Sequence, residues 1–147
     1  THTLLTVTSD MAAYSPATPT TAPATPATSS TPATWLTQNL IRKRLGNTAP
    51  ENAKILDLTP TDSHRIRKLE NLSNLPCLTH LILRNNAISK IECLNALSCL
   101  QVLDLTGNSV KKIEGLENLS HLNTLLLDGN KISHIPPKFK APTLRVL

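Results

Sequence analysis

The sequence predicts an α/β solenoid, in which a curved parallel sheet forms one side and 3₁₀ or short helical turns form the other. The first observation behind this prediction is a 22-residue period in the second half of the chain. The second is the alternation in Leu81-Ile82-Leu83 and its equivalents, which is typical of a strand buried on one face. The third is an Asn that follows each such strand. The recurring residues are Leu78, Leu81, Leu83, Asn86, Ile88, Ile91, Leu94 and Leu97, then Leu100, Leu103, Leu105, Asn108, Val110, Ile113, Leu116 and Leu119, then Leu122, Leu125, Leu127, Asn130, Ile132 and Ile135, and finally Leu144 and Leu147.

Each position of this repeat has a structural role. Stacked copies of the strand form a parallel sheet with a spacing of ~4.8 Å between neighbours. The amides of Asn86, Asn108 and Asn130 can bond backbone groups that a turn leaves unpaired, so we expect an internal ladder of Asn side chains. The apolar residues that follow, such as Ile88 and Ile91, recur at every third position. This spacing indicates 3₁₀-like or short helical turns on the convex side.

The first repeat is irregular. Its expected strand, Ile55-Leu56-Asp57-Leu58, is displaced by three residues from the 22-residue register, and His64 stands where the Asn is expected. We interpret residues 59–63 as a longer turn that carries an insertion. Terminal repeats of solenoids are commonly atypical because they cap the core.

The N-terminal part divides into two segments. Residues 1–33 are interpreted as a disordered tail, because residues 12–34 are almost entirely Ala, Thr, Ser and Pro. Residues 34–46 are predicted to form a helix that covers the open end of the solenoid, with Gly46 at the usual stop position. Its apolar face includes Trp35, which we expect to pack on the first repeat. Residues 47–147 then hold about four repeats and the start of a fifth, and we expect the natural protein to continue beyond Leu147.

Charge and composition argue against several classes of function. The chain carries a net charge of +5, but from residue 47 onward twelve Lys and Arg face nine Asp and Glu. That balance falls short of a nucleic-acid footprint, so no direct nucleic-acid contact is expected. No Gly-rich phosphate loop or zinc-protease motif is present. Asp104 and Asp128 lie on adjacent repeats, but such carboxylates on an open sheet are more typical of partner contacts than of an acid–base pair. We expect no catalysis, cofactor, small-molecule substrate or membrane segment.

The three cysteines favour a reducing compartment. Cys77 and Cys99 occupy the same position in successive repeats, and His121 occupies it in the third. A metal site is one interpretation, but a linear column supplies no fourth ligand for a tetrahedral zinc ion. A Cys77–Cys99 disulfide is conceivable, yet the cysteine count is odd. Free thiols in an intracellular protein are therefore the expectation.

The motifs also resemble a known family. The Lys-Ile-Glu-x-Leu of residues 90–94 and 112–116, with the Gly-Asn pairs at 107–108 and 129–130, resembles the phosphatase-regulator subfamily of leucine-rich repeats. That subfamily is intracellular. It includes the nuclear regulatory subunit of type 1 protein phosphatase, axonemal dynein light-chain and assembly proteins, the spliceosomal A-prime protein and centrosomal scaffolds. The resemblance implies a non-enzymatic module that binds proteins.

The strand pattern predicts the binding surface. The third, fifth and seventh positions of each repeat should face the concave side, and Ile82, Val102 and Leu126 are apolar there. They form either an anchor patch flanked by charges or ordinary scattered aliphatics. The predicted partner-binding residues are His80, Ile82, Arg84, Val102, Asp104, Thr106, Thr124, Leu126 and Asp128, with Ile55, Asp57 and Thr59 as their counterparts in the first repeat.

We expect an interaction module with a protein partner on that face, within a centrosomal or ciliary scaffold. The alternatives are a regulatory subunit of type 1 protein phosphatase and an assembly protein of a ribonucleoprotein. A cytoplasmic location is expected for the scaffold, and the nucleus is the alternative.

Overall fold

The structure, a computed structural model, describes residues 33–137 and 145–146, which belong to one compact unit spanning Pro32–Leu147. The predicted disordered tail lies almost entirely outside the described residues. So do Leu144 and Leu147, on which the start of a fifth repeat was predicted.

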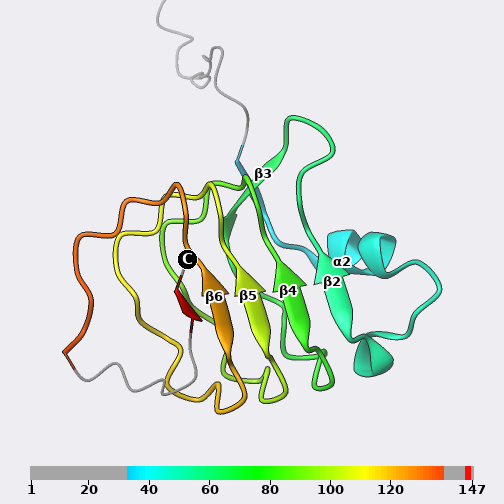
Figure 1. The fold of residues 1–147 in the computed structure, drawn as a ribbon. Helices are drawn as coiled ribbons and strands as arrows, with labels where there is room; N and C mark the ends of the chain where they lie inside the picture. The colour runs from blue at the N-terminus through cyan, green and yellow to red at the C-terminus, as the bar shows by residue number, and fades with distance from the viewer. Residues whose placement is uncertain (1–32, 138–144, 147) are drawn as a thin grey trace, which may run out of the picture. The chain divides into compact units, whose positions relative to one another are not determined.

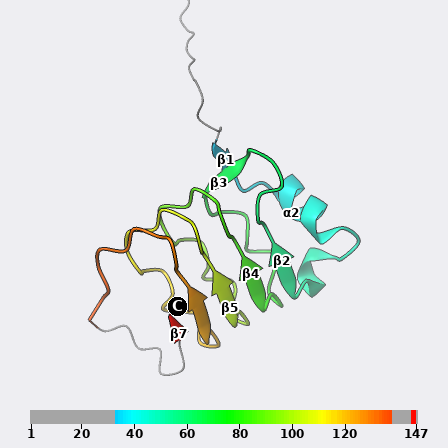
Figure 2. The same ribbon diagram turned by 45° about the horizontal axis from the view of Figure 1, so that its top comes forward.

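The strands β2 (Ile55–Asp57), β4 (His80–Ile82), β5 (Val102–Asp104), β6 (Thr124–Leu126) and β7 (Arg145–Val146) form a parallel sheet in that order. Figures 1 and 2 show them side by side, with all arrows pointing the same way. Leu81, Leu103 and Leu125 stand opposite one another at steps of 22 residues. Ile55 stands opposite His80, 25 positions later, which confirms the predicted displacement of the first strand.

The interior is filled by the repeated leucines and isoleucines. In β4 and β6 the central leucine is buried while the residues on either side are more accessible, which confirms the predicted alternation there. In β5 the alternation is broken, because Asp104 is buried beside Leu103. On the other side, the chain returns through turns rather than helices. The backbone N–H of Leu97 donates to the carbonyl of Leu94 at 2.9 Å, and that of Leu100 donates to the carbonyl of Leu97 at 3.0 Å. These bonds to the third preceding residue confirm the 3₁₀-like character that the spacing predicts.

The Asn ladder is also confirmed. The Asn108 amide donates to the carbonyls of Leu83 and Leu105, both at 2.9 Å, and its oxygen accepts from the N–H of Ile88 at 3.0 Å. Asn86 and Asn130 make the equivalent bonds one repeat away. Each Asn thus joins its own turn to the repeat before it. His64 takes no part in this ladder, because it lies exposed on the inserted loop and bonds Asp62 instead.

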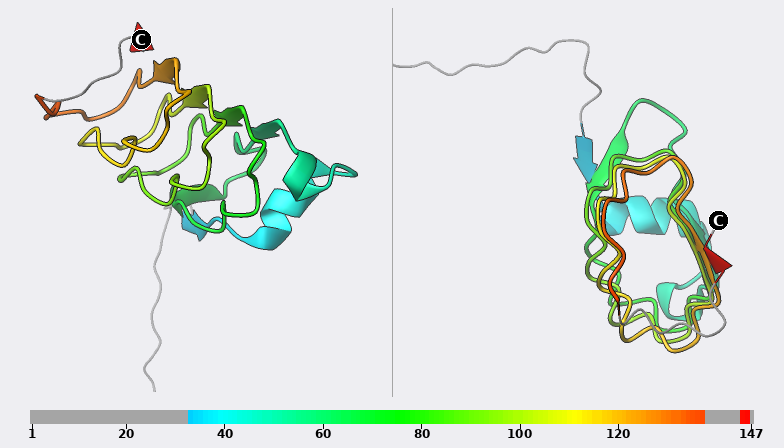
Figure 3. Two further views of the ribbon diagram at one scale, coloured as in Figure 1. Left: turned by 90° about the horizontal axis from the view of Figure 1, so that it is seen from below. Right: turned by 60° about the vertical axis from the view of Figure 1, so that its left-hand side comes forward.

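A helix covers the N-terminal end of the stack, as predicted. Helix α2 (Gln38–Leu45) buries Ile41 and Leu45 in the core, and the right-hand view of Figure 3 shows it running across the opening of the coil of repeats. The hydroxyl of Thr37 accepts from the N–H of Leu40 at 3.2 Å, which fixes the helix start. Gly46 closes the helix at φ 62°, donating its N–H to the carbonyl of Arg42. A short 3₁₀ helix, η2 (Pro50–Asn52), then leads into β2.

The helix begins later than the sequence suggested, and the prediction for Trp35 was wrong. Ala33–Trp35 forms a strand, β1, which pairs in parallel with β3 (Arg65–Lys68). The backbone of Thr37 is extended, at φ −101° and ψ 156°, so the helix cannot include the residues before it. Trp35 is 65% exposed, whereas Leu36 is fully buried and fills the place expected for it.

Strand β1 forms the edge of a second hydrogen-bonded layer, on the side opposite the main sheet. The N–H of Ala87 donates to the carbonyl of Ile66, and the same bond recurs between Ser109 and Ile88 and between Lys131 and Val110. We call this the outer layer, and it consists of residues 33–35, 65–68, 87–90, 109–112 and 131–134.

Among the described residues, no helix has both the length and the apolarity needed to cross a bilayer.

Two hydrogen bonds that the sequence did not reveal connect the segment after β3 to the start of the helical cap. Asn71, which adopts φ 63°, donates its amide to the carbonyl of Leu36 at 2.7 Å, and its own carbonyl accepts from the side chain of Gln38 at 3.1 Å.

Candidate functional site

The concave face is the outward side of the main sheet. The sheet register places its side chains in two rows, and a third row follows where the strands end. The first row is Ile55, His80, Val102 and Thr124, the second is Asp57, Ile82, Asp104 and Leu126, and the third is Thr59, Arg84, Thr106 and Asp128.

The three predicted apolar anchors do not form one continuous strip. Ile82 and Leu126 lie in the same row, but Asp104 stands between them. Val102 lies in the neighbouring row, diagonal to both. All three are half-buried, and Ile55, at the N-terminal edge, is 60% exposed. The surface therefore presents separate aliphatic side chains with polar groups between them.

Asp104 has a different setting from the exposed flanking charge that the sequence suggested. It is only 2% exposed, and its carboxylate accepts from Arg84 Nε and from the N–H of Thr106, the latter at 3.0 Å. Its partner is therefore Arg84, while Asp128 lies exposed one row away and contributes its carbonyl to the N–H of Gly107. In the described residues, the Asp104 carboxylate is bonded to Arg84 and Thr106 and not to Asp128.

Asp57, which is exposed on the edge strand, shares with Asp104 the bond from the N–H two residues later. Its carboxylate accepts from the N–H of Thr59 at 2.9 Å. Partial burial raises the pKa of Asp57, but the hydrogen bonds from Thr59 and the charges of Arg44 and Arg84 outweigh that effect, and the net pKa is lowered. On the part of the concave face formed by β2, β4, β5, β6 and the turns that follow them, the charged groups are thus the carboxylates of Asp57, Asp104 and Asp128 and the guanidinium of Arg84.

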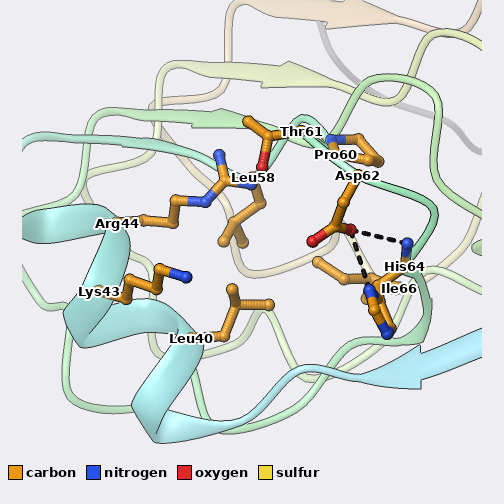
Figure 4. Close-up of a pocket in the computed structure, with 9 residues that line it drawn as sticks. All are labelled: Leu40, Lys43, Arg44, Leu58, Pro60, Thr61, Asp62, His64 and Ile66. Atoms are coloured by element: carbon orange, nitrogen blue, oxygen red, sulfur yellow. Dashed lines mark hydrogen bonds and ion pairs between the residues drawn. The ribbon is translucent and has the colours of Figure 1, made fainter.

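A cleft of about 180 Å³ lies between helix α2 and the inserted loop (Figure 4). Lys43 and Arg44 enter it from the helix, and Asp62 and His64 enter it from the loop. Leu40, Leu58, Pro60, Thr61 and Ile66 complete the lining. The displaced first strand indicated this loop in the sequence, but nothing in the sequence indicated that the loop meets the helix.

The polar groups around this cleft largely satisfy one another. The Arg44 guanidinium donates to the carbonyls of Thr59 at 2.9 Å and of Asp57 at 3.3 Å. Hydrogen bonds from the backbone and ring of His64 hold the pKa of the Asp62 carboxyl below its ordinary value. The cleft is therefore better explained as the joint between cap and first repeat than as a reaction site.

The remaining candidates for chemistry are dispersed. Cys77, Cys93 and Cys99 are exposed free thiols. His121 bonds the carbonyl of Ser98, or its neighbouring hydroxyl, rather than a cysteine. Over the described residues, no three His, Cys, Asp or Glu side chains gather in a way that would hold a metal ion.

Comparison with known proteins matches this architecture. A family model described as leucine-rich repeats (2 copies) matches residues 78–120. The structure of an internalin from Listeria monocytogenes is similar, with a TM-score of 0.54 and 28% identity over 65% of this chain and 28% of that chain. The fold is that of a leucine-rich repeat protein.

Two further leucine-rich repeat structures are similar. A TLR13 chain solved as a complex with single-stranded RNA gives a TM-score of 0.53 and 33% identity, over 65% of this chain and 14% of that one. A chain of the Drosophila melanogaster SNF/U2A′ complex gives a TM-score of 0.50 and 28% identity, over 77% of this chain and 83% of that one. No curated protein sequence matches significantly.

The three matches cover very different shares of the similar chains. The chain spans only about a quarter of the internalin and a seventh of the TLR13 chain, but most of the chain from the SNF/U2A′ complex. Leucine-rich repeat solenoids are typically protein–protein interaction modules, because stacked repeats present extended surfaces to partners. The concave face of this leucine-rich repeat domain is accordingly its candidate site.

Proposed function

We propose that this chain is a non-catalytic, intracellular module that binds a protein segment on its concave face. The observation that carries the proposal is the second row of that face, in which Asp57, Ile82, Asp104 and Leu126 alternate carboxylates with aliphatic side chains. A rigid sheet that presents such a row needs no rearrangement to receive a partner, which lowers the entropic cost of binding.

The charge of the face indicates the chemistry of the partner. Arg84 neutralises the buried Asp104, so Asp57 and Asp128 remain as exposed carboxylates on either side of the half-buried Ile82 and Leu126. A segment that carries apolar side chains between Lys or Arg residues would complement this surface. Burial of the two aliphatics under the partner would contribute most of the affinity, and the flanking charges would set its orientation.

Two cellular settings are supported by different observations. The segments at residues 36–43, 54–58, 67–72 and 132–136 resemble the N-terminal repeats of centriolin, which favours a centrosomal or ciliary scaffold. The likeness to a chain of the SNF/U2A′ complex, which extends over 83% of that chain, favours a role in assembling a ribonucleoprotein. A regulatory subunit of type 1 phosphatase rests on the subfamily resemblance alone.

Affinity capture from cell lysate tests the proposal. The whole chain serves as bait beside an Ile82→Glu/Leu126→Glu variant, and bound proteins are identified by mass spectrometry. The proposal predicts a partner that the wild-type chain retains and the variant loses. Centrosomal or axonemal proteins in that set would favour the scaffold, spliceosomal proteins the ribonucleoprotein, and type 1 phosphatase the regulatory subunit.

A matched control separates the site from the added charge. Ser73→Glu/Ala96→Glu adds the same two negative charges at exposed positions on the convex turns. Circular dichroism should show that both variants are folded. Equal retention of the partner by both variants would contradict the concave site while leaving the fold unaffected.

A further inference from the structure

The outer layer concentrates positive charge that the sequence scatters. Seven Lys and Arg lie on it, and one half-buried glutamate follows it in each of three repeats, which leaves a net charge of +4. The cations are Arg65, Arg67, Lys68, Lys90, Lys111, Lys112 and Lys131, and the glutamates are Glu70, Glu92 and Glu114. The opposite, concave face carries three Asp and one Arg over the repeats of β2 to β6. The fold therefore separates charges that nearly cancel in the sequence.

These cations form an ordered column. The backbone bonds that recur every 22 residues align equivalent positions, so Lys68, Lys90 and Lys112 follow one another, and Lys112 pairs with His134. Neighbouring segments of the backbone in such a layer lie ~4.8 Å apart. Lys90 contacts Glu92 at 3.7 Å, but the lysine side chain is 61% exposed and the glutamate only 26%. The positive groups therefore project beyond the negative ones.

An exposed aromatic ring begins the column. In the pairing of β1 with β3, the register shifts by one residue after Thr34, which places Trp35 opposite Lys68, and Trp35 is 65% exposed. A large apolar side chain at the edge of a cationic surface, with no core to fill, is a group that can stack on another flat ring. Single-stranded nucleic acids are recognised by this combination of a basic track for phosphates and an aromatic platform for a base.

We propose that the outer layer binds single-stranded nucleic acid, with Trp35 stacking on a base and Lys68, Lys90 and Lys112 contacting successive phosphates. An acidic peptide would satisfy the cations but would leave Trp35 without a flat partner. A paired duplex would withhold its bases from the ring. The site is separate from the concave face, so a protein partner and a nucleic-acid strand can bind the module together.

Trp35 is the only tryptophan of the chain, and its fluorescence therefore reports on the proposed contact directly. Titration with a uridine dodecamer should quench this fluorescence, and a fluorescein-labelled dodecamer should gain anisotropy over the same concentrations. Trp35→Ala should weaken binding by roughly tenfold, and Trp35→Phe should restore most of it, because any aromatic ring can stack. A thymidine dodecamer in parallel distinguishes RNA preference from general binding.

Charge reversal tests the lysine column. Lys112→Glu should weaken binding and reduce its salt dependence by roughly one phosphate contact. Lys54→Glu is the matched control, because Lys54 is also exposed but precedes β2, outside the outer layer. An unchanged Trp35 emission, equal losses in both lysine variants, or competition by polyglutamate as strong as by the oligonucleotide would overturn the proposal.

Discussion

Arg84 and Asp104 form an ion pair between successive repeats, and Asp104 is the one charged side chain buried in the described part of the chain. Arg84 lies in the turn that follows β4, and Asp104 ends β5, so the pair joins two neighbouring repeats. Arg84 itself remains half-exposed. The concave face is thereby stiffened at its centre, between the two aliphatics proposed to hold a partner.

Arg84→Ala should destabilise the domain, because it leaves the Asp104 carboxylate buried with only the Thr106 N–H as a partner. We expect a loss of about 1–3 kcal/mol in the free energy of unfolding, less than for a fully buried pair because water can approach from the side of Arg84. Urea denaturation measures this loss. Arg84→Ala/Asp104→Asn should be more stable than Arg84→Ala alone, and simple additivity of the two changes would contradict the role assigned to the pair.

Asn108→Ala should be among the most damaging single changes on the turn. It deprives the carbonyls of Leu83 and Leu105 and the N–H of Ile88 of their buried partner. We expect a loss of about 2–4 kcal/mol. Thermal denaturation of this variant and of Asn130→Ala measures the loss of stability. Because Asn130 is only partly buried, Asn130→Ala should lower the stability less than Asn108→Ala. Equal losses at the two positions would contradict the dependence on burial.

The left-handed position shared by Asn71, Cys93 and Gly115 predicts opposite effects in neighbouring repeats. Cys93 adopts φ 60°, so Cys93→Gly should relieve backbone strain and stabilise the domain by about 1 kcal/mol. Gly115 adopts φ 72°, and a Cβ there would meet the Ile91 carbonyl oxygen at 2.7 Å. Gly115→Ala should therefore destabilise by about 2 kcal/mol or more. Melting temperatures that shift in the same direction would contradict this account.

Asp57 should make the domain sensitive to acid. Its pKa is lowered in the folded state from an ordinary value of 3.8, so its contribution is fully present at neutral pH and is lost as the pH falls through the folded pKa. Asp57→Asn should lower stability at pH 7 and have little effect near pH 2. Denaturation curves at both pH values measure this, and a difference that grows in acid would contradict the stated sign.

Several features follow from the sequence because they depend on local pattern. The repeat period fixes which leucines are inward, and alternate residues of a strand must face opposite ways. Asn86, Asn108 and Asn130 were identified because an amide at a turn has few other roles. The helix ends at Gly46 because only glycine adopts its backbone conformation readily.

Other features escaped the sequence because they depend on contacts between distant segments. Trp35 belongs to a helical pattern by its neighbours, yet pairing with β3, some thirty residues later, draws its backbone into a strand and leaves its ring in solvent. Asp104 occupies an outward position by periodicity, yet Arg84 from another repeat makes its burial favourable.

The sequence by itself determined the solenoid, its register and its internal Asn ladder, because each repeat has apolar residues at the same buried positions and an Asn at the same turn. Only the tertiary structure decided where charge gathers. Stacking sets equivalent residues side by side, so Lys68, Lys90 and Lys112, spread along the chain, become one column, and the carboxylates of Asp57, Asp104 and Asp128 become the opposite face. The composition gives only the sum of these charges. In the fold, the leucine core separates the lysine column on one side from the carboxylates on the other.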